Sequence, residues 1–120
     1  MNNIRCMTKN EKLLLKVLLG NIKEKYRNIN FIYSNTIINW GDSSGSFDFV
    51  YETKIDPKNN RSTNISKVYF YDVDKIICEV ILLAYIDKRC LYCIDILKLG
   101  ENDLIQLPTN EREFFINNGE

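Results

Sequence analysis

Hydrophobic positions repeat along the chain with two different periods, and the change of period separates a helical part from a part made of strands. Residues 9–26 carry apolar side chains three or four positions apart, namely Leu14, Leu15, Leu18, Leu19, Ile22 and Tyr26. This spacing predicts an amphipathic helix that packs on a sheet, with a helix lying on a membrane surface as the alternative. Thr8 and Glu11 are spaced as a capping box, which places the start of the helix directly after Thr8.

Beyond residue 28, apolar and polar side chains alternate as they do along half-buried strands. The pattern predicts strands at residues 31–38, 47–52, 67–72, 76–86 and 90–98, with the last two joined as a hairpin by a turn at 87–89. Asn110 and Glu113 are spaced to cap a short C-terminal helix. Because no repeat or long linker divides the chain, we expect one α+β domain over residues 1–120, with the N-terminal helix packed on an antiparallel meander of about five strands.

The predicted hairpin has two faces of different character. Its three-residue turn pairs Ile86 with Cys90, Leu83 with Cys93 and Ile81 with Asp95. One face is almost wholly apolar and suits the N-terminal helix; it carries Cys78, Val80, Leu82, Ala84, Ile86, Cys90, Tyr92, Ile94 and Ile96. The other mixes apolar with acidic side chains; it carries Glu79, Ile81, Leu83, Tyr85, Leu91, Cys93, Asp95 and Leu97. We expect this second face to be covered by Phe114 and Phe115, by a second copy of the chain, or by a partner, because it is too apolar to be bare and too acidic to be a sealed core.

Charge is distributed unevenly along the chain although the net charge is zero. Residues 1–30 contain seven Lys or Arg and two Asp or Glu, whereas residues 31–120 contain nine and fourteen. An acidic sheet that carries aromatic side chains attracts a basic protein and steers its approach, although an ordinary solvated surface would have the same composition. The zero net charge argues against a nucleic acid as partner, since binding of phosphates depends on an excess of Lys and Arg.

Three short patterns suggest chemistry, and each lacks something that the chemistry requires. Residues 41–45 match G-x-S-x-G, but the α/β-hydrolase elbow needs a strand-to-helix turn and a histidine, and the chain contains no histidine. Cys90 and Cys93 match C-x-x-C, but three positions apart on a strand they are expected on opposite faces, where they share neither a metal nor a disulfide. Asp72 and Asp74 lack the further ligands of a calcium loop. We therefore predict no catalytic residue, no cofactor and no bound metal, and a protein that is not an enzyme.

The compartment follows from segments that the sequence lacks. The first residues show no apolar stretch of a signal peptide, and the longest apolar run, residues 76–86, is too short to cross a bilayer. The four cysteines are then expected as free thiols. These features predict a cytoplasmic protein with no membrane partner.

Several segments resemble a family of small bacterial domains to which no function is assigned. Residues 11–15 match its helix pattern E-x-x-L-L, and residues 40–50 match its aspartate- and glycine-rich turn before a strand. Residues 92–98 and 104–108 match its ending, L-D-I-W-K followed by L-I-x-L-P, with Leu97 where that family has tryptophan. The resemblance implies an α+β fold with a final hairpin and implies no catalytic residues. Domains of this kind are also similar to immunity proteins, which neutralise the toxin domains of contact-dependent or polymorphic bacterial toxin systems.

These expectations combine into a protein-binding function. We predict a non-catalytic module, most simply an immunity protein that binds a cognate toxin domain through the acidic, aromatic sheet face. The residues expected to contact the partner are Asp48, Glu52, Tyr69, Tyr71, Asp72, Asp74, Glu79 and Asp95. The alternatives are a homodimeric structural or regulatory domain that buries the same face against its own copy, and a small-molecule enzyme, which would need a deep pocket with converging polar groups.

Overall fold

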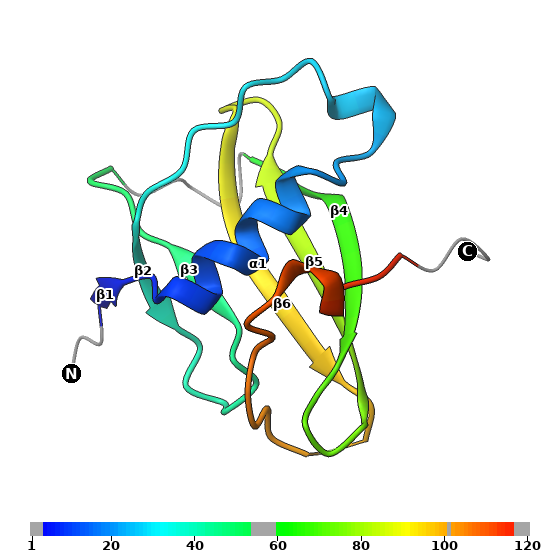
Figure 1. The fold of residues 1–120 in the computed structure, drawn as a ribbon. Helices are drawn as coiled ribbons and strands as arrows, with labels where there is room; N and C mark the ends of the chain where they lie inside the picture. Colours follow the sequence, from blue (N-terminus) through cyan, green and yellow to red (C-terminus); the bar gives the residue numbers. More distant parts are fainter. Residues whose placement is uncertain (1–3, 54–59, 101, 117–120) are drawn as a thin grey trace.

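Over the residues that it describes, the structure has an α+β fold in which one α-helix packs on one side of a six-stranded antiparallel sheet (Figure 1). The computed structural model describes residues 4–53, 60–100 and 102–116. Its elements are β1 (Ile4–Cys6), α1 (Lys9–Leu19), the 3-10 turn η1 (Glu24–Tyr26), β2 (Thr36–Asn39), β3 (Phe47–Phe49), β4 (Ser62–Tyr71), β5 (Ile77–Tyr85), β6 (Cys90–Lys98) and the 3-10 turn η2 (Glu111–Glu113). Within the described ranges, no helix has the length and hydropathy needed to cross a membrane.

The strand order β1-β2-β3-β6-β5-β4 consists of two meanders joined side by side. The second meander enters the sheet in reverse, so that β6 lies beside β3 and β4 forms the far edge. The sheet therefore has six strands rather than about five, and it is not one continuous meander. The additional strand, β1, has three residues, which is too few to show an alternating pattern in the sequence.

The helix α1 begins as predicted but ends earlier. Glu11 donates its backbone N–H to the Thr8 hydroxyl at 3.2 Å, and its carboxylate accepts the Thr8 N–H at 2.8 Å, which completes the capping box. Arg5 of β1 donates to the same carboxylate at 2.7 and 2.8 Å and ties the start of the helix to the sheet. The helix stops at Gly20, and Ile22 forms a bridge with β4 instead of a further helical turn. The prediction of a helix to residue 26 is therefore wrong, because Ile22 packs on the core in an extended segment.

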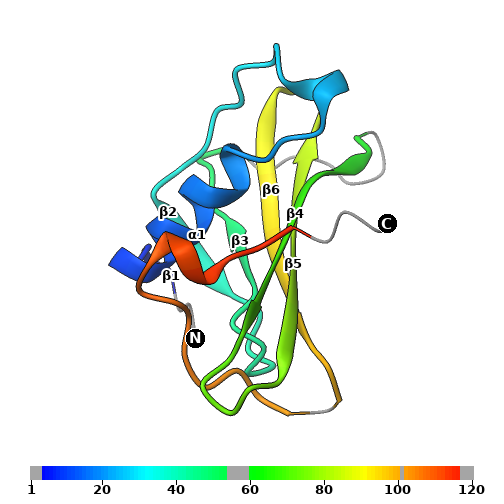
Figure 2. The same ribbon diagram turned by 45° about the vertical axis from the view of Figure 1, so that its right-hand side comes forward.

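The hydrophobic core lies between α1 and the face of the sheet that α1 covers, which we call the inner face (Figure 2). Leu14, Leu15 and Leu18 of α1 are buried there. They pack with buried strand residues, namely Ile37, Phe47, Val68, Phe70, Cys78, Val80, Leu82, Ala84, Leu91, Ile94 and Ile96. The expectation that the helix packs on the sheet is confirmed, and most of the hairpin residues predicted for its seat are in place.

A β-bulge in the β5–β6 hairpin changes which side chains face the core. The predicted pairs Leu83–Cys93 and Ile81–Asp95 are confirmed. Beyond them Tyr85, rather than Ile86, pairs with Cys90, because the turn contains the four residues 86–89 instead of three. Leu91 therefore enters the core, and Tyr92, the extra residue of the bulge, turns to the opposite face beside Tyr85. The sequence prediction had these two neighbours, Leu91 and Tyr92, exchanged.

A buried ion pair attaches the segment after β6 to the end of β4. The Asp72 carboxylate accepts hydrogen bonds from the N–H groups of Ile105 and Gln106 at 2.8 and 3.1 Å. It also accepts from the Lys98 ammonium at 3.0 Å, and both side chains are almost fully buried. Burial alone would raise the pKa of Asp72, but these donors outweigh burial and lower the pKa. Asp72 therefore stabilises the fold as an anion.

The predicted C-terminal helix is a single 3-10 turn, η2. Asn110 and Glu113 form its capping box as expected, but the chain becomes extended immediately afterwards. Phe115 exchanges two backbone hydrogen bonds with Tyr69 of β4, at 2.8 and 2.9 Å. Phe114 packs edge-on against Phe70 in the core. The C-terminal segment is thus held along the edge of β4 rather than wound into a helix.

Candidate functional site

The face of the sheet opposite α1, which we call the outer face, combines the features expected of a binding surface. In the part of the chain that the structure describes, no helix lies against β4, β5 and β6 on this side (Figure 2). Strand pairing places the following side chains on it: Asp48, Lys67, Tyr69, Tyr71, Ile77, Glu79, Ile81, Leu83, Tyr85, Tyr92, Cys93, Asp95 and Leu97. Most are half-buried by their neighbours, while Tyr71 and Leu97 are 58% and 50% exposed.

Three carboxylates cross the outer face in a diagonal row. Asp48 of β3 pairs with Cys93, which lies two residues before Asp95 on β6. Asp95 in turn pairs with Ile81, which lies two residues after Glu79 on β5. Diagonal neighbours on one face of an antiparallel sheet lie roughly 7–8 Å apart. Pairing alone therefore aligns Asp48, Asp95 and Glu79 across three adjacent strands, which we call the acidic row.

The acidic row is electrostatically crowded. Partial burial, followed by the charges of Asp42 and Glu79, raises the pKa of Asp95. Burial, together with the carboxylates on either side, raises the pKa of the Cys93 thiol to about 12. Among the described residues of β3 to β6, one basic side chain, that of Lys67, lies on the outer face. Its Nζ lies 3.9 Å from Glu79 Oε2. Three carboxylates thus share the face with one ammonium, and a cationic surface would relieve their mutual repulsion.

Aromatic rings occupy the β4 edge of the outer face. Phe115 stacks on Tyr69 and Tyr71 with ring centroids 5.7 and 5.3 Å apart. The Tyr69 hydroxyl donates to Glu79 Oε2 at 3.3 Å, and Tyr69 is only 6% exposed. Tyr69 therefore holds Glu79 in place, whereas Tyr71 remains open to a partner. Of the two phenylalanines expected to cover this face, Phe115 reaches only the edge and Phe114 turns into the core.

Three of the predicted contact residues lie away from the acidic row. Asp72 is buried against Lys98 and the backbone after β6, so it is assigned a structural role and not a contact. Asp74, in the turn between β4 and β5, lies 2.8 Å from Lys98 Nζ. Glu52 is exposed in a bend, because β3 ends at Phe49 and the strand predicted to residue 52 is shorter. The structure thus brings together Asp48, Glu79 and Asp95 with the two β4 tyrosines, and separates the other three.

A pocket opens on the outer face beside the bulge, and sequence reasoning missed it. It has a volume of about 250 Å³ and is lined by Ile38, Asp48, Phe49, Val50, Tyr51, Thr53, Tyr85 and Tyr92. The indole Nε1 of Trp40 donates to Asp48 Oδ1 at 2.8 Å. The sequence did contain a signal for it in the order Leu91-Tyr92. The aliphatic Leu91 suits the core better than Tyr92, whose hydroxyl needs a polar partner, and a bulge that shifts the alternation by one residue places them in this way.

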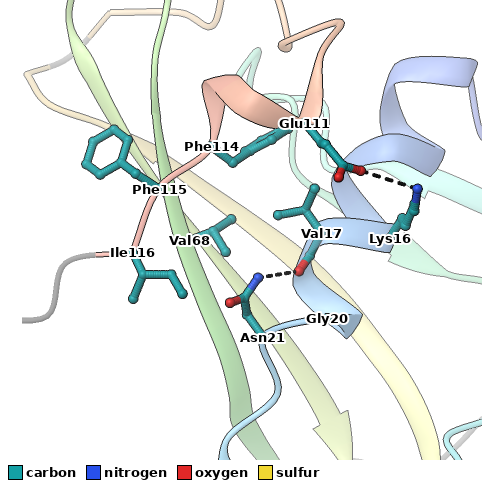
Figure 3. Close-up of a pocket in the computed structure, with 9 residues that line it drawn as sticks. All are labelled: Lys16, Val17, Gly20, Asn21, Val68, Glu111, Phe114, Phe115 and Ile116. Carbon is teal, nitrogen blue, oxygen red and sulfur yellow. Dashed lines mark hydrogen bonds and ion pairs between the residues drawn. The ribbon is translucent and has the colours of Figure 1, made fainter.

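A second hollow, of about 540 Å³, lies between the C-terminal end of α1 and the segment after η2 (Figure 3). Its polar side chains are engaged with neighbours. Lys16 Nζ lies 3.2 Å from Glu111 Oε2, and Asn21 Nδ2 donates to the Val17 carbonyl at 2.8 Å. Since these groups are paired with each other and not directed at a common point, we do not place the functional site here.

The patterns that suggested chemistry occupy structural positions. Residues 41–45 lie in the loop between β2 and β3, a strand-to-strand connection as predicted. Cys90 and Cys93 are free and buried, but the prediction of opposite faces is wrong, because the bulge pairs them with Tyr85 and Leu83 on the same face. Burial raises the pKa of both thiols. Within the described residues, no group of three or more Cys, Asp or Glu side chains is arranged to hold a metal ion.

The fold and the outer face together define a small helix-on-sheet α+β domain with an acidic, aromatic sheet surface. Residues 4–108 match the family described as "Domain of unknown function (DUF6984)", and the chain therefore belongs to this family. No curated protein and no solved structure matches the chain.

Segments that carried the resemblance in the sequence contribute to the fold. Glu11 caps α1, while Leu14 and Leu15 fill the core. Ile105 and Gln106 donate to the buried Asp72. Asp95 differs from these residues, because partial burial and neighbouring carboxylates raise its pKa. Two members of the acidic row, Asp48 and Asp95, lie within the same segments, at residues 40–50 and 92–98.

Proposed function

We propose that this protein is a non-catalytic binding module whose outer face docks on a basic surface of another protein. The observation that carries the proposal is the acidic row, Asp48, Asp95 and Glu79, on a face with partly exposed aromatic and aliphatic side chains. Like charges that share one face of a sheet repel each other, and the charge of Glu79 contributes to the raised pKa of Asp95. A cationic partner removes that repulsion, and the apolar neighbours supply the desolvated centre that interfaces require.

The charge distribution supports a defined orientation of docking. Lys9, Lys12 and Lys16 of α1 are exposed. The helix α1 itself lies on the side of the sheet opposite the outer face (Figure 2). The molecule therefore presents a basic side and an acidic side, although its net charge is zero. A basic protein is steered toward the outer face and away from α1.

We further propose that the partner is a toxin domain and that the protein acts as a cytoplasmic immunity protein. An inhibitor of this kind needs no chemistry of its own, because it acts by covering the surface through which the toxin binds its substrate. Toxins that act on nucleic acids carry such basic surfaces, since phosphate binding requires Lys and Arg. The acidic outer face has the charge that would occupy a surface of that kind.

Self-association of the outer face is the alternative, and the acidic row argues against it. Two copies meeting through this face would bring their carboxylates together, which disfavours the dimer at neutral pH. Light scattering on the purified protein separates the two functions. We expect a monomer at neutral pH and moderate salt, and a stable dimer lost on substituting Asp95 would assign the face to self-association instead.

Charge reversal with a matched control tests the docking surface. The double variant Glu79→Lys/Asp95→Lys reverses two charges of the acidic row, and Glu24→Lys/Glu111→Lys makes the same change at exposed positions in η1 and η2. Each protein is immobilised and exposed to lysate of the native cell, and a protein retained by the wild type and the control but not by the double variant is purified. Titration calorimetry should then show binding about 100-fold weaker for the double variant.

Two outcomes decide between the parts of the proposal. Equal affinity of wild type and double variant, with matching unfolding curves, would show that the outer face is not the docking surface. The immunity role requires that the captured partner arrests growth when expressed alone and that coexpression of the wild-type chain, but not the double variant, restores growth. A partner that leaves growth unaffected would remove the immunity role and leave the docking surface intact.

A further inference from the structure

The pocket beside the bulge has a shape and chemistry that identify one kind of occupant. Its walls come from strands that meet where β3 ends, and Tyr85 and Tyr92 form one side with ring centroids 4.9 Å apart and planes at 40°. Asp48, the first member of the acidic row, forms part of another side. Resting on the proposed function, we infer that this pocket receives a single arginine side chain of the docked protein.

The size of the pocket favours one side chain over a free metabolite or cofactor. Its volume is about 250 Å³, below the roughly 300–1,000 Å³ of typical small-molecule sites. Aliphatic groups of Ile38 and Val50 also line it, so it offers apolar walls for the methylene stem of a long side chain. A pocket that holds one anchor side chain in an otherwise shallow face is the usual setting of an interface hot spot.

The lining carries the two groups that recognise an organic cation. Aromatic faces attract a cation held within about 6 Å of the ring centroid, and a carboxylate neutralises its charge. Burial, and then the charge of Asp48, raises the pKa of the Tyr92 phenol, so ring and carboxylate interact in the same partly desolvated surrounding. A neutral or anionic side chain would leave Asp48 without a counter-charge in this pocket.

The orientation of Asp48 favours arginine over lysine. Trp40 Nε1 donates to Asp48 Oδ1 at 2.8 Å and restricts how the carboxylate can turn. A planar guanidinium can stack on a tyrosine ring and donate to a carboxylate in the same plane, whereas an ammonium binds as a point charge. The tilted pair Tyr85 and Tyr92 beside a carboxylate that is hydrogen-bonded to Trp40 suits the planar group.

Nuclear magnetic resonance with small probes tests the pocket without the partner. The full chain, labelled with ¹⁵N, is titrated with N-acetyl-arginine amide and, separately, with the citrulline counterpart, in which a neutral urea replaces the guanidinium. We expect saturable shifts at residues 48, 85 and 92 with the arginine probe, at a dissociation constant on the order of 1–10 mM. We expect no saturable shift with the citrulline probe and weaker binding of N-acetyl-lysine amide.

Three variants assign the binding to the pocket. Asp48→Asn should weaken arginine binding at least about tenfold, equivalent to about 1.4 kcal/mol. Tyr92→Phe keeps the ring and should bind as the wild type does, whereas Tyr92→Leu should lose the saturable shifts while retaining a cooperative unfolding transition. Glu24→Gln, which removes an exposed charge in η1, is the matched control and should have no effect.

The inference is overturned if citrulline and arginine probes bind equally, if lysine binds more tightly than arginine, if the arginine shifts do not saturate, or if Asp48→Asn binds as the wild type does. Its failure can be told apart from failure of the proposed function. A partner that depends on Glu79 and Asp95, combined with no response to the arginine probe, would leave the docking surface valid and remove the arginine pocket. Arginine binding in the pocket, combined with a partner whose affinity does not depend on Glu79 and Asp95, would support the arginine pocket and remove the proposed docking surface.

Discussion

Replacement of Asp72 by asparagine tests whether this carboxylate holds the fold together rather than contacting a partner. Its Oδ2 accepts from Lys98 Nζ at 3.0 Å and from Ile105 N–H at 2.8 Å, and its Oδ1 accepts from Val73 N–H at 2.7 Å and Gln106 N–H at 3.1 Å. Every neighbour named is a donor. An asparagine amide must therefore direct its NH₂ group at two of them and lose both hydrogen bonds.

The expected loss of stability follows from these contacts. Removing one partner of a buried ion pair costs about 3–5 kcal/mol, but Lys98 retains Asp74 at 2.8 Å and the Asp103 carbonyl at 3.1 Å. We therefore expect the low end, about 3 kcal/mol at pH 7, out of a total free energy of unfolding of about 5–15 kcal/mol. For a domain of this size, that loss lowers the melting temperature by roughly 10–15 °C.

Urea unfolding followed by fluorescence of Trp40 and by circular dichroism measures this loss, and its pH dependence provides an internal check. Because the pKa of Asp72 is lowered in the fold, its contribution is present above the pKa of the unfolded carboxyl and is lost as pH falls through the folded value. The difference between wild type and variant should therefore shrink in acid. A difference below about 1 kcal/mol at pH 7, or one that stays constant into acid, would refute the structural role.

The remaining predictions concern stability and reactivity. Asp95→Asn should stabilise the isolated protein at pH 7 by about 0.5 kcal/mol. Because the pKa of Asp95 is raised in the fold, the wild type loses stability as pH rises through that folded pKa, when the carboxyl becomes charged, and the variant does not. Calorimetric melting from pH 3 to 8 checks the sign. Gly45→Ala should destabilise by about 1–3 kcal/mol in urea, since φ is +87° and an added Cβ would lie 2.4 Å from Leu104 Cδ2. Of the four free thiols, only the exposed Cys6 should react quickly with an aromatic disulfide reagent at pH 8, while buried thiols such as Cys93, with its pKa of about 12, should react only on unfolding.

The parts of the fold that the sequence predicted are those governed by local pattern. Thr8 and Glu11 cap α1 because the capping box needs only residues three apart. Alternation correctly predicted which residues of β5, and of β6 from Cys93 onward, face the core. The bulge was missed because it depends on the length of the turn at 86–89, which alternation does not determine, and it exchanged the faces of Leu91 and Tyr92.

Long-range partners decided which predicted site residues were placed correctly. Glu79 and Asp95 were assigned to one face by alternation, and the register confirms that they share it. Asp72 had the sequence context of a solvated turn, but its partners Ile105 and Gln106 lie 33 and 34 residues away. No local sequence pattern predicts contacts between residues so far apart in the chain. The pocket at Asp48 was missed for the same reason, since its lining combines residues in and after β3 with Tyr85 and Tyr92, which lie beside the turn of the β5–β6 hairpin.

Cross-saturation between a purified partner and the deuterated, ¹⁵N-labelled chain measures the docking surface directly. Irradiating the partner should reduce the amide signals of residues on β3, β5 and β6 near Asp48, Glu79 and Asp95, and leave those of α1 unchanged. Signal loss concentrated on α1 or η2, with the amides around the acidic row unaffected, would contradict the assignment of the outer face as the binding surface.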